Sequence, residues 1–137
     1  GMMESGGRRV DKMIRIDIGS LEVCSRDMTA GICRKIPLMS DYTIGKDEDL
    51  PTNSQLYRIY IGLYLSQHPM VAKSLDLIIA QREPCEFGLP IEVYFFLTDK
   101  VWSEFEHIQS DIFDHLLVMV QKFDLKLYQL ECPLPMG

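Results

Sequence analysis

The densest group of side chains that could do chemistry lies between residues 104 and 115. Its five members carry carboxylate or imidazole groups at intervals of three or four residues: Glu104, His107, Asp111, Asp114 and His115. On a helix, that spacing places several of them on one face. Glu-x-x-His is a ligand pair in di-iron bundles, but such sites need a second pair and two further carboxylates from other helices. The other helix predicted in this chain has no Glu or Asp, so we favour a solvated or subunit-facing polar face and assign no metal ligand.

No other group of residues has the pattern of a catalytic centre. His68 precedes Pro69, but no nucleophile or orienting partner can be named for it, so a capping role at a helix end fits better. Residues 19–22 follow a predicted strand, yet Glu22 stands where a phosphate would need hydrogen-bond donors. The sequence has no glycine-rich nucleotide loop, no nucleophile elbow and no H-E-x-x-H motif. We predict that the chain is not an enzyme and has neither catalytic residues nor a cofactor.

The charge of the chain argues against a nucleic acid as its partner. The net charge is −6, whereas a nucleic-acid footprint needs a dense face of Lys and Arg. Arg8 and Arg9 form only a short basic spot, for which we favour a solvated role over phosphate or lipid binding. Five aromatic side chains invite comparison with RNA-stacking sheets: Tyr57, Tyr60, Tyr64, Tyr94 and Phe96. The RNP-type motif of such sheets is missing, so we expect these rings under the helices or at a subunit contact.

The composition is that of one globular domain. The chain has 137 residues, of which 47% are hydrophobic and 25% charged. Four cysteines are scattered without a C-x-x-C pair: Cys24, Cys33, Cys85 and Cys132. We expect reduced thiols in a cytosolic domain and no zinc site. The longest apolar runs, 93–97 and 116–120, are far shorter than the roughly 20 residues that span a bilayer, so we expect this chain itself to stay out of the membrane.

Four segments are predicted to be strands. Ile14, Ile16 and Ile18 alternate with polar residues, which predicts a strand over 12–18 with one buried face. Residues 75–82 and 91–97 are predicted to form a long hairpin. In the second of these strands the odd-numbered residues, from Ile91 to Leu97, share one face. Residues 125–130 alternate as a last short strand.

Two segments are predicted to be helices. Thr52 and Gln55 have the spacing of a capping box, apolar residues then recur at helical spacing, and His68-Pro69 ends the segment. Asp99 is the expected N-cap of the second helix. Its apolar stripe contains Val101, Phe105, Ile108, Ile112, Leu116, Val120 and Phe123.

The order of these elements predicts the fold class. It runs strand, loop-rich insertion over 20–50, helix, strand, strand, helix, strand. This is the order of an α+β, ferredoxin-like (split βαβ) sheet with two helices on one face. We expect residues 1–11 to be the end of a preceding β domain or a linker, 12–131 to be the ferredoxin-like domain, and 132–137 to be a tail.

Four segments, in this order, resemble one protein family. Residues 101–115, with the letters VWSEFEHIQSDIFDH, are similar to the last-helix signature of the small-conductance mechanosensitive channel (MscS-like) family, and most of all to its miniconductance branch. The segments 4–9, 57–69 and 88–94 also resemble that family. Together the four segments extend over most of the chain outside residues 20–50.

The resemblance implies a membrane channel of which this chain is a C-terminal cytoplasmic part. In that family, transmembrane helices precede a β-rich domain and a ferredoxin-like domain. The family assembles as heptamers whose cytoplasmic domains form a perforated vestibule, and it releases solutes on hypo-osmotic shock. The full-length protein would then lie in the cell inner membrane, with this part on the cytoplasmic side, as vestibule wall and subunit-assembly domain. The alternative is a stand-alone ferredoxin-like regulatory or ligand-binding domain, which fold order alone suggests.

Overall fold

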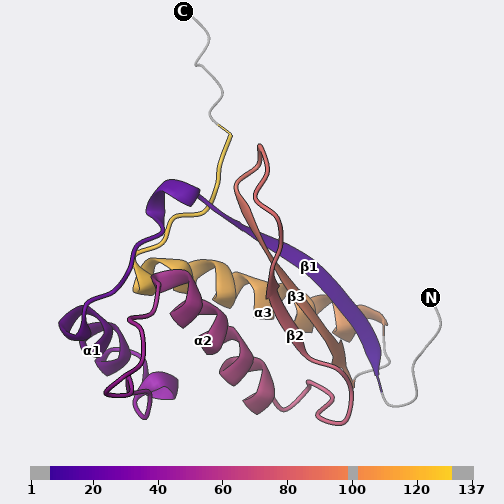
Figure 1. Cartoon of the computed structure of the whole chain (residues 1–137). Helices are drawn as coiled ribbons and strands as arrows, with labels where there is room; N and C mark the ends of the chain where they lie inside the picture. Colours follow the sequence, from indigo (N-terminus) through magenta and orange to yellow (C-terminus); the bar gives the residue numbers. More distant parts are fainter. Residues whose placement is uncertain (1–6, 99–101, 131–137) are drawn as a thin grey trace, which may run out of the picture.

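The computed structural model describes residues 7–98 and 102–130, and there it has a mixed α/β architecture (Figure 1). The sheet is antiparallel and has the strand order β1-β3-β2. Its strands are β1 (Arg8–Ile16), β2 (Ile78–Gln81) and β3 (Leu89–Leu97). The helices are α1 (Arg26–Arg34), α2 (Asn53–Gln67) and α3 (Trp102–Met119), with shorter 3₁₀ segments η1 (Ile18–Ser20), η2 (Pro37–Met39) and η3 (Val120–Phe123).

The sheet forms around β3, which pairs with a strand on each side. The odd-numbered residues of β3 are buried against the helices, as their alternation predicts: Leu89, Ile91, Val93, Phe95 and Leu97. On β1, Val10, Ile14 and Ile16 are buried and Lys12 lies between them with its ammonium group over the ring of Phe113. One face of β1 and β3 therefore forms a continuous apolar surface on which the helices pack.

Helices α2 and α3 begin and end largely where the residue pattern predicts. The hydroxyl of Thr52 accepts a hydrogen bond from the Gln55 amide at 3.1 Å, and α2 ends at Gln67, before His68-Pro69. On α3, the side chains of Phe105, Ile112 and Leu116 are buried. The expected cap Asp99 and the first stripe residue Val101 lie outside the described residues.

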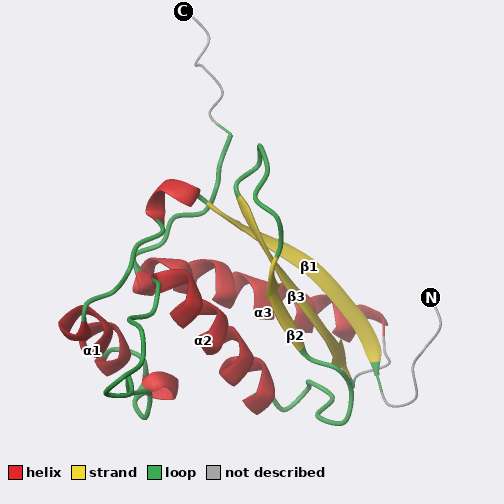
Figure 2. Cartoon of the chain, in the orientation of Figure 1, coloured by secondary structure: helices red, strands yellow, loops and turns green. Residues whose placement is uncertain are grey.

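The loop-rich insertion that we predicted over 20–50 is wrong in part, because it contains a third helix. Ser25 caps α1 by accepting a hydrogen bond from the Met28 amide at 3.0 Å, and Thr29, Ile32 and Cys33 face inward. α1 has only nine residues and contains Gly31, a weak helix former, so the sequence alone favours it less than the two longer helices. Figure 2 shows α1 on the side of α2 away from the strands.

β2 is shorter than the strand predicted over 75–82, whereas β1 begins and ends earlier than the strand predicted over 12–18. β2 pairs with β3 only as far as Ile78, and the rest of β3 is paired by an earlier part of the chain. There Val71 bridges to Leu97, and the Ala72 amide donates to the Phe96 carbonyl. Residues 73–77 therefore loop out of the ladder, and β2 cannot extend back to residue 75.

The predicted last strand, 125–130, is also wrong over most of its length. Leu127 forms a single bridge with Ile16, flanked by backbone hydrogen bonds from Asp17 to Lys126 and from Tyr128 to Arg15. The following residues leave the sheet (Figure 1). At the other end, β1 begins at Arg8, so one strand runs through the boundary that we expected between residues 11 and 12. Among the described residues, no helix is both long and apolar enough to cross a membrane.

Candidate functional site

The five acidic and imidazole residues of the last helix do not converge on one point. Glu104, His107, Asp111 and Asp114 are exposed on α3, whereas His115 is half-buried and turned toward α2. Within the described chain, no three His, Cys, Asp or Glu side chains are grouped so that they could hold a metal ion. The four exposed groups share one face of α3, as their spacing predicts, but they are spread along its axis, because each residue adds about 1.5 Å of rise.

His115 joins α3 to α2 through two tyrosines. Its Nε2 lies 2.6 Å from the hydroxyl of Tyr60, and its ring stacks on that of Tyr64 with 4.4 Å between the centroids. Tyr60 is only 4% exposed. Burial lowers the pKa of His115 and raises the pKa of Tyr60. At neutral pH the imidazole is thus largely uncharged, and which ring nitrogen carries the proton sets the direction of its hydrogen bond with Tyr60.

This His115–tyrosine cluster connects α2 to α3. A second tyrosine, Tyr57, is fully buried beside it and donates its hydroxyl to the Leu116 carbonyl at 2.5 Å. Burial raises the pKa of Tyr57 well above its ordinary value, so the hydroxyl stays protonated as a donor. The spacing of Tyr57, Tyr60 and Tyr64 along the sequence gave one signal for this cluster, but the pairing with His115 is visible only in the tertiary structure.

The end of α2 is capped by a lysine that the sequence did not point to. The ammonium group of Lys73 donates to the carbonyls of Val71 at 2.9 Å and of His68. His68 was expected to take this part, but its Nδ1 instead accepts the Met70 amide at 3.1 Å. Burial and the charge of Lys73 lower the pKa of His68. Lys73 lies where a cation stabilises the end of a helix, because the C-terminal carbonyls of a helix carry partial negative charge.

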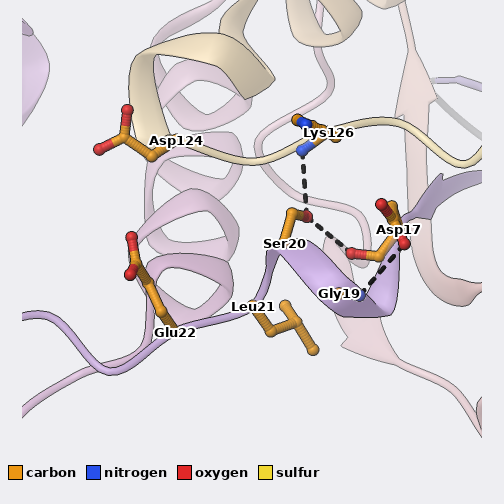
Figure 3. A pocket seen from close by; sticks show the side chains of 7 residues that line it. All are labelled: Asp17, Gly19, Ser20, Leu21, Glu22, Asp124 and Lys126. Carbon is orange, nitrogen blue, oxygen red and sulfur yellow. Dashed lines mark hydrogen bonds between the residues drawn. The ribbon is translucent and has the colours of Figure 1, made fainter.

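A polar pocket with a volume of about 310 Å³ lies beside the loop that follows β1. Its lining contains Asp17, Gly19, Ser20, Leu21, Glu22, Asp124 and Lys126. Figure 3 shows the carboxylates of Glu22 and Asp124 extending to one side, away from Asp17. Asp17 is already engaged, since its Oδ1 accepts the Gly19 amide at 3.1 Å. The acidic lining that the sequence predicted for this loop excludes a phosphate site here.

Asn53 is the residue that holds this pocket together. It is fully buried at the start of α2, and its Nδ2 donates to the Ser20 carbonyl at 3.0 Å. It also donates to the Asp124 carbonyl at 3.4 Å and accepts the Glu22 amide at 3.0 Å. One side chain thus connects three segments that are distant in the sequence. Sequence reasoning missed it because Asn53 stands next to the more obvious cap Thr52.

The basic spot at Arg8 and Arg9 is divided between the two faces of the sheet. The Arg8 guanidinium lies over the rings of Trp102 and Phe105, 5.0 and 4.9 Å from their centroids. Arg9 faces the opposite side, where it is exposed. Cation–π contacts of this kind stabilise packing, and they account for Arg8 without a phosphate or lipid ligand.

The outer face of the sheet carries the remaining aromatic pair and an acidic pair. Tyr94 and Phe96 meet edge to face, with 5.7 Å between centroids. Arg82 forms an ion pair with Glu92 at 2.6 Å, and a hydrogen bond with Glu92 raises the pKa of Asp11. No model of a known protein family matches the sequence.

Proposed function

We propose that this chain is the C-terminal cytoplasmic domain of a mechanosensitive channel of the small-conductance family, in its miniconductance branch. Its role there is that of a vestibule wall and subunit-assembly domain, in a channel that releases solutes on hypo-osmotic shock. The observation that carries the proposal is the resemblance of residues 101–115 to the last-helix signature of that family. The heptameric assembly and the inner-membrane location of the full-length protein are part of the same proposal.

The contacts among the four resembling segments support this proposal. Arg8 from the first segment lies over Trp102 and Phe105 from the last. Tyr57 from the second segment donates to Leu116, one residue beyond the last segment. The third segment supplies the start of β3, where Ile91 pairs with Ile14 of β1. Segments that resemble a family separately and also share one core are better support than separate short matches.

We also propose that the fold is ferredoxin-like in its details. The antiparallel order β1-β3-β2 fits the split βαβ arrangement, in which the third strand lies between the first two. The bridge of Leu127 to Ile16 lies on the free side of β1, where the fourth strand of such a sheet would pair. The extra helix α1 is then an insertion between β1 and α2.

The buried hydrogen bonds of the described residues suit a rigid domain in a vestibule wall. The buried polar groups link elements to one another: Tyr57 to Leu116, Tyr60 to His115, and Asn53 to the segments at 20–22 and at Asp124. A satisfied buried network of this kind makes a domain rigid. In such a channel, tension does its work on the membrane-embedded part, and this domain supports assembly and filters solutes.

The upstream coding sequence gives the first test. We expect hydrophobic spans of about 20 residues before Gly1. If an upstream open frame lacks them, the proposal fails and the stand-alone regulatory or ligand-binding domain takes its place.

The second test uses the full-length gene in a strain that lacks its own mechanosensitive channels. We expect the gene to restore survival of hypo-osmotic shock. Ile112→Asp buries an unpaired charge in the core, so this variant should lose both survival and the heptamer seen by cross-linking. His107→Gln alters an exposed residue of the same helix and serves as the control. Equal survival with I112D and with the unaltered gene would show that this domain is dispensable.

A further inference from the structure

Part of the outer edge of β1 has no partner in the described chain. β1 is an edge strand, because β3 pairs with it on one side only. On its other side, the single bridge of Ile16 with Leu127 covers the end of the strand. There the Arg15 carbonyl accepts the Tyr128 amide, and the Asp17 amide donates to the Lys126 carbonyl.

The alternation of a strand identifies which backbone groups continue this edge. In an antiparallel ladder, the N–H and C=O of one residue point to the same side, and those of the next residue point to the other. Since Arg15 and Asp17 point away from β3, so do Met13, Asp11 and Arg9. All three are exposed, and none has a backbone hydrogen bond on this side within the described residues. We call the N–H and C=O groups of Arg9, Asp11 and Met13 the free edge.

The strand that carries the free edge is also basic, in contrast to the chain as a whole. β1 contains Arg8, Arg9, Lys12 and Arg15 against one acid, Asp11, which gives it a formal charge of +3 in a chain of net charge −6. Arg9 and Arg15 lie on the outer face of the sheet, and Arg8 and Lys12 lie on the helix side. A strand added along this edge would therefore have cations above and below it.

We propose that the free edge of β1 binds an extended acidic segment of another protein, which adds a strand to the sheet. Backbone hydrogen bonds to Arg9, Asp11 and Met13 supply the attachment, and the flanking cations select acidic side chains. The inference does not depend on the proposed function, since it rests on the sheet order, the hydrogen bonds and the charge of β1.

Two other readings of the edge lead to different results. Pairing of β1 with β1 of a second copy would bring two strands of charge +3 together, which like-charge repulsion disfavours. Alternatively, charged side chains can protect an exposed edge from any pairing. The second reading predicts no binding at all, so a binding experiment separates it from the proposal.

The experiment uses the 137-residue chain and a short labelled peptide in which glutamate alternates with valine. Its control is the same peptide with lysine in place of glutamate. Fluorescence anisotropy gives the affinity, and hydrogen exchange followed by NMR gives the protection of the backbone amides. We expect the acidic peptide to bind, with binding weakened by added salt, and to slow exchange at Arg9, Asp11 and Met13. The lysine peptide should not bind.

Two variants test whether the backbone edge and its charge are both used. Met13→Pro removes an N–H that faces the free edge and takes no bond from the β1–β3 ladder, so the sheet should persist in far-UV circular dichroism. Arg9→Glu reverses a flanking charge, and Arg34→Glu makes the same charge change on α1, away from the edge. We expect M13P and R9E each to weaken binding by about tenfold or more, and R34E to leave it nearly unchanged.

Three outcomes would overturn the proposal. The first is equal affinity for the acidic and lysine peptides, or no binding of either. The second is binding that R9E and M13P leave unaltered, because the peptide then lies elsewhere. The third is a dimer in analytical ultracentrifugation that M13P dissociates, because the occupant of the edge is then a second copy. If M13P does not fold, R9E and the exchange of the three amides still decide the question.

Discussion

At the scale of single residues, the half-buried histidines have the clearest consequence for solution behaviour. Burial lowers the pKa of both His68 and His115 below the ordinary value of 6.5, and the charge of Lys73 adds to the effect at His68. The unfolded chain therefore binds more protons than the folded chain just below pH 6.5. It follows that the free energy of unfolding decreases as pH falls through this window. Above the window, the two neutral histidines make their full contribution to stability.

The first prediction concerns His115 and its partner. Urea unfolding at pH 7.5 and at pH 5.5 should show lower stability at the acidic pH, with a smaller difference in His115→Gln. NMR titration of the imidazole should give a pKa below 6.5. If both folded histidines titrate above the unfolded value, the sign of this prediction is wrong.

The hydrogen bond between Tyr60 and His115 gives a second prediction. Tyr60→Phe removes the hydroxyl and leaves Nε2 of His115 without its partner, so it should destabilise the fold by about 1 kcal/mol. Tyr94→Phe is the matched control, because among the described residues the Tyr94 hydroxyl makes no hydrogen bond and its ring contacts Phe96. Equal effects of Y60F and Y94F in denaturant unfolding would contradict the assignment.

Asn53 gives a third prediction, and a larger effect. Asn53→Ala leaves the Ser20 carbonyl and the Glu22 amide without their buried partner, so we expect a loss of about 2–3 kcal/mol. Gln55→Ala, an exposed position in the same first turn of α2, should cost far less. Thermal unfolding of the two variants measures the difference, and similar midpoints would mean that Asn53 is not a central connection.

At the scale of elements, two glycines illustrate how the same residue type can be required or dispensable. Gly88 starts β3 with φ +87°, and a Cβ there would lie 2.6 Å from the Ile16 carbonyl. Gly31 stands in the middle of α1, and a Cβ there would meet nothing within 4 Å. The turn into β3 therefore requires glycine, whereas α1 merely tolerates it.

The fourth prediction follows from this contrast. Gly88→Ala should destabilise the protein by about 2 kcal/mol or more, because of both the left-handed backbone and the clash. Gly31→Ala should stabilise it by up to about 1 kcal/mol, because alanine favours a helix interior. Chemical denaturation of both variants checks the opposite signs. A destabilising G31A would mean that something outside the described contacts occupies the space above Gly31.

At the scale of the whole molecule, stability should be unequally distributed. β3 is paired on both sides and buries its odd-numbered side chains, so its amides should exchange only on global unfolding. The segment from α1 to η2 lies outside α2, and its neighbouring loop is held largely by Arg26, whose guanidinium donates to the carbonyls of Ile44 and Gly45.

The fifth prediction is therefore that this peripheral segment opens by itself. Native-state hydrogen exchange should show faster exchange in α1 than at Ile91 and Val93 of β3, and Arg26→Ala should widen the gap. Arg34→Ala, at the exposed end of the same helix, is the control. Identical exchange in α1 and β3 would mean that the domain unfolds as one unit.

The sequence by itself determined the elements whose residue pattern is long and regular. β3, α2 and α3 follow from period-2 and period-3.6 alternation with caps at Thr52 and a stop at His68-Pro69, because local backbone geometry sets those periods. The acidic lining after β1 was also predictable from Asp17 and Glu22. α1 has only nine residues and contains Gly31, a weak helix former, so its formation depends on packing.

Only the tertiary structure decided which distant groups meet. The pairing of Tyr60 with His115, the three connections of Asn53 and the early end of the last strand depend on contacts between segments far apart in the sequence. It also showed that the polar residues of α3 gain no further ligands from a second element among the described residues, because groups spaced by three or four on one helix lie a turn apart along its axis. Local periodicity encodes elements, whereas a site or a free strand edge exists only once the elements are packed.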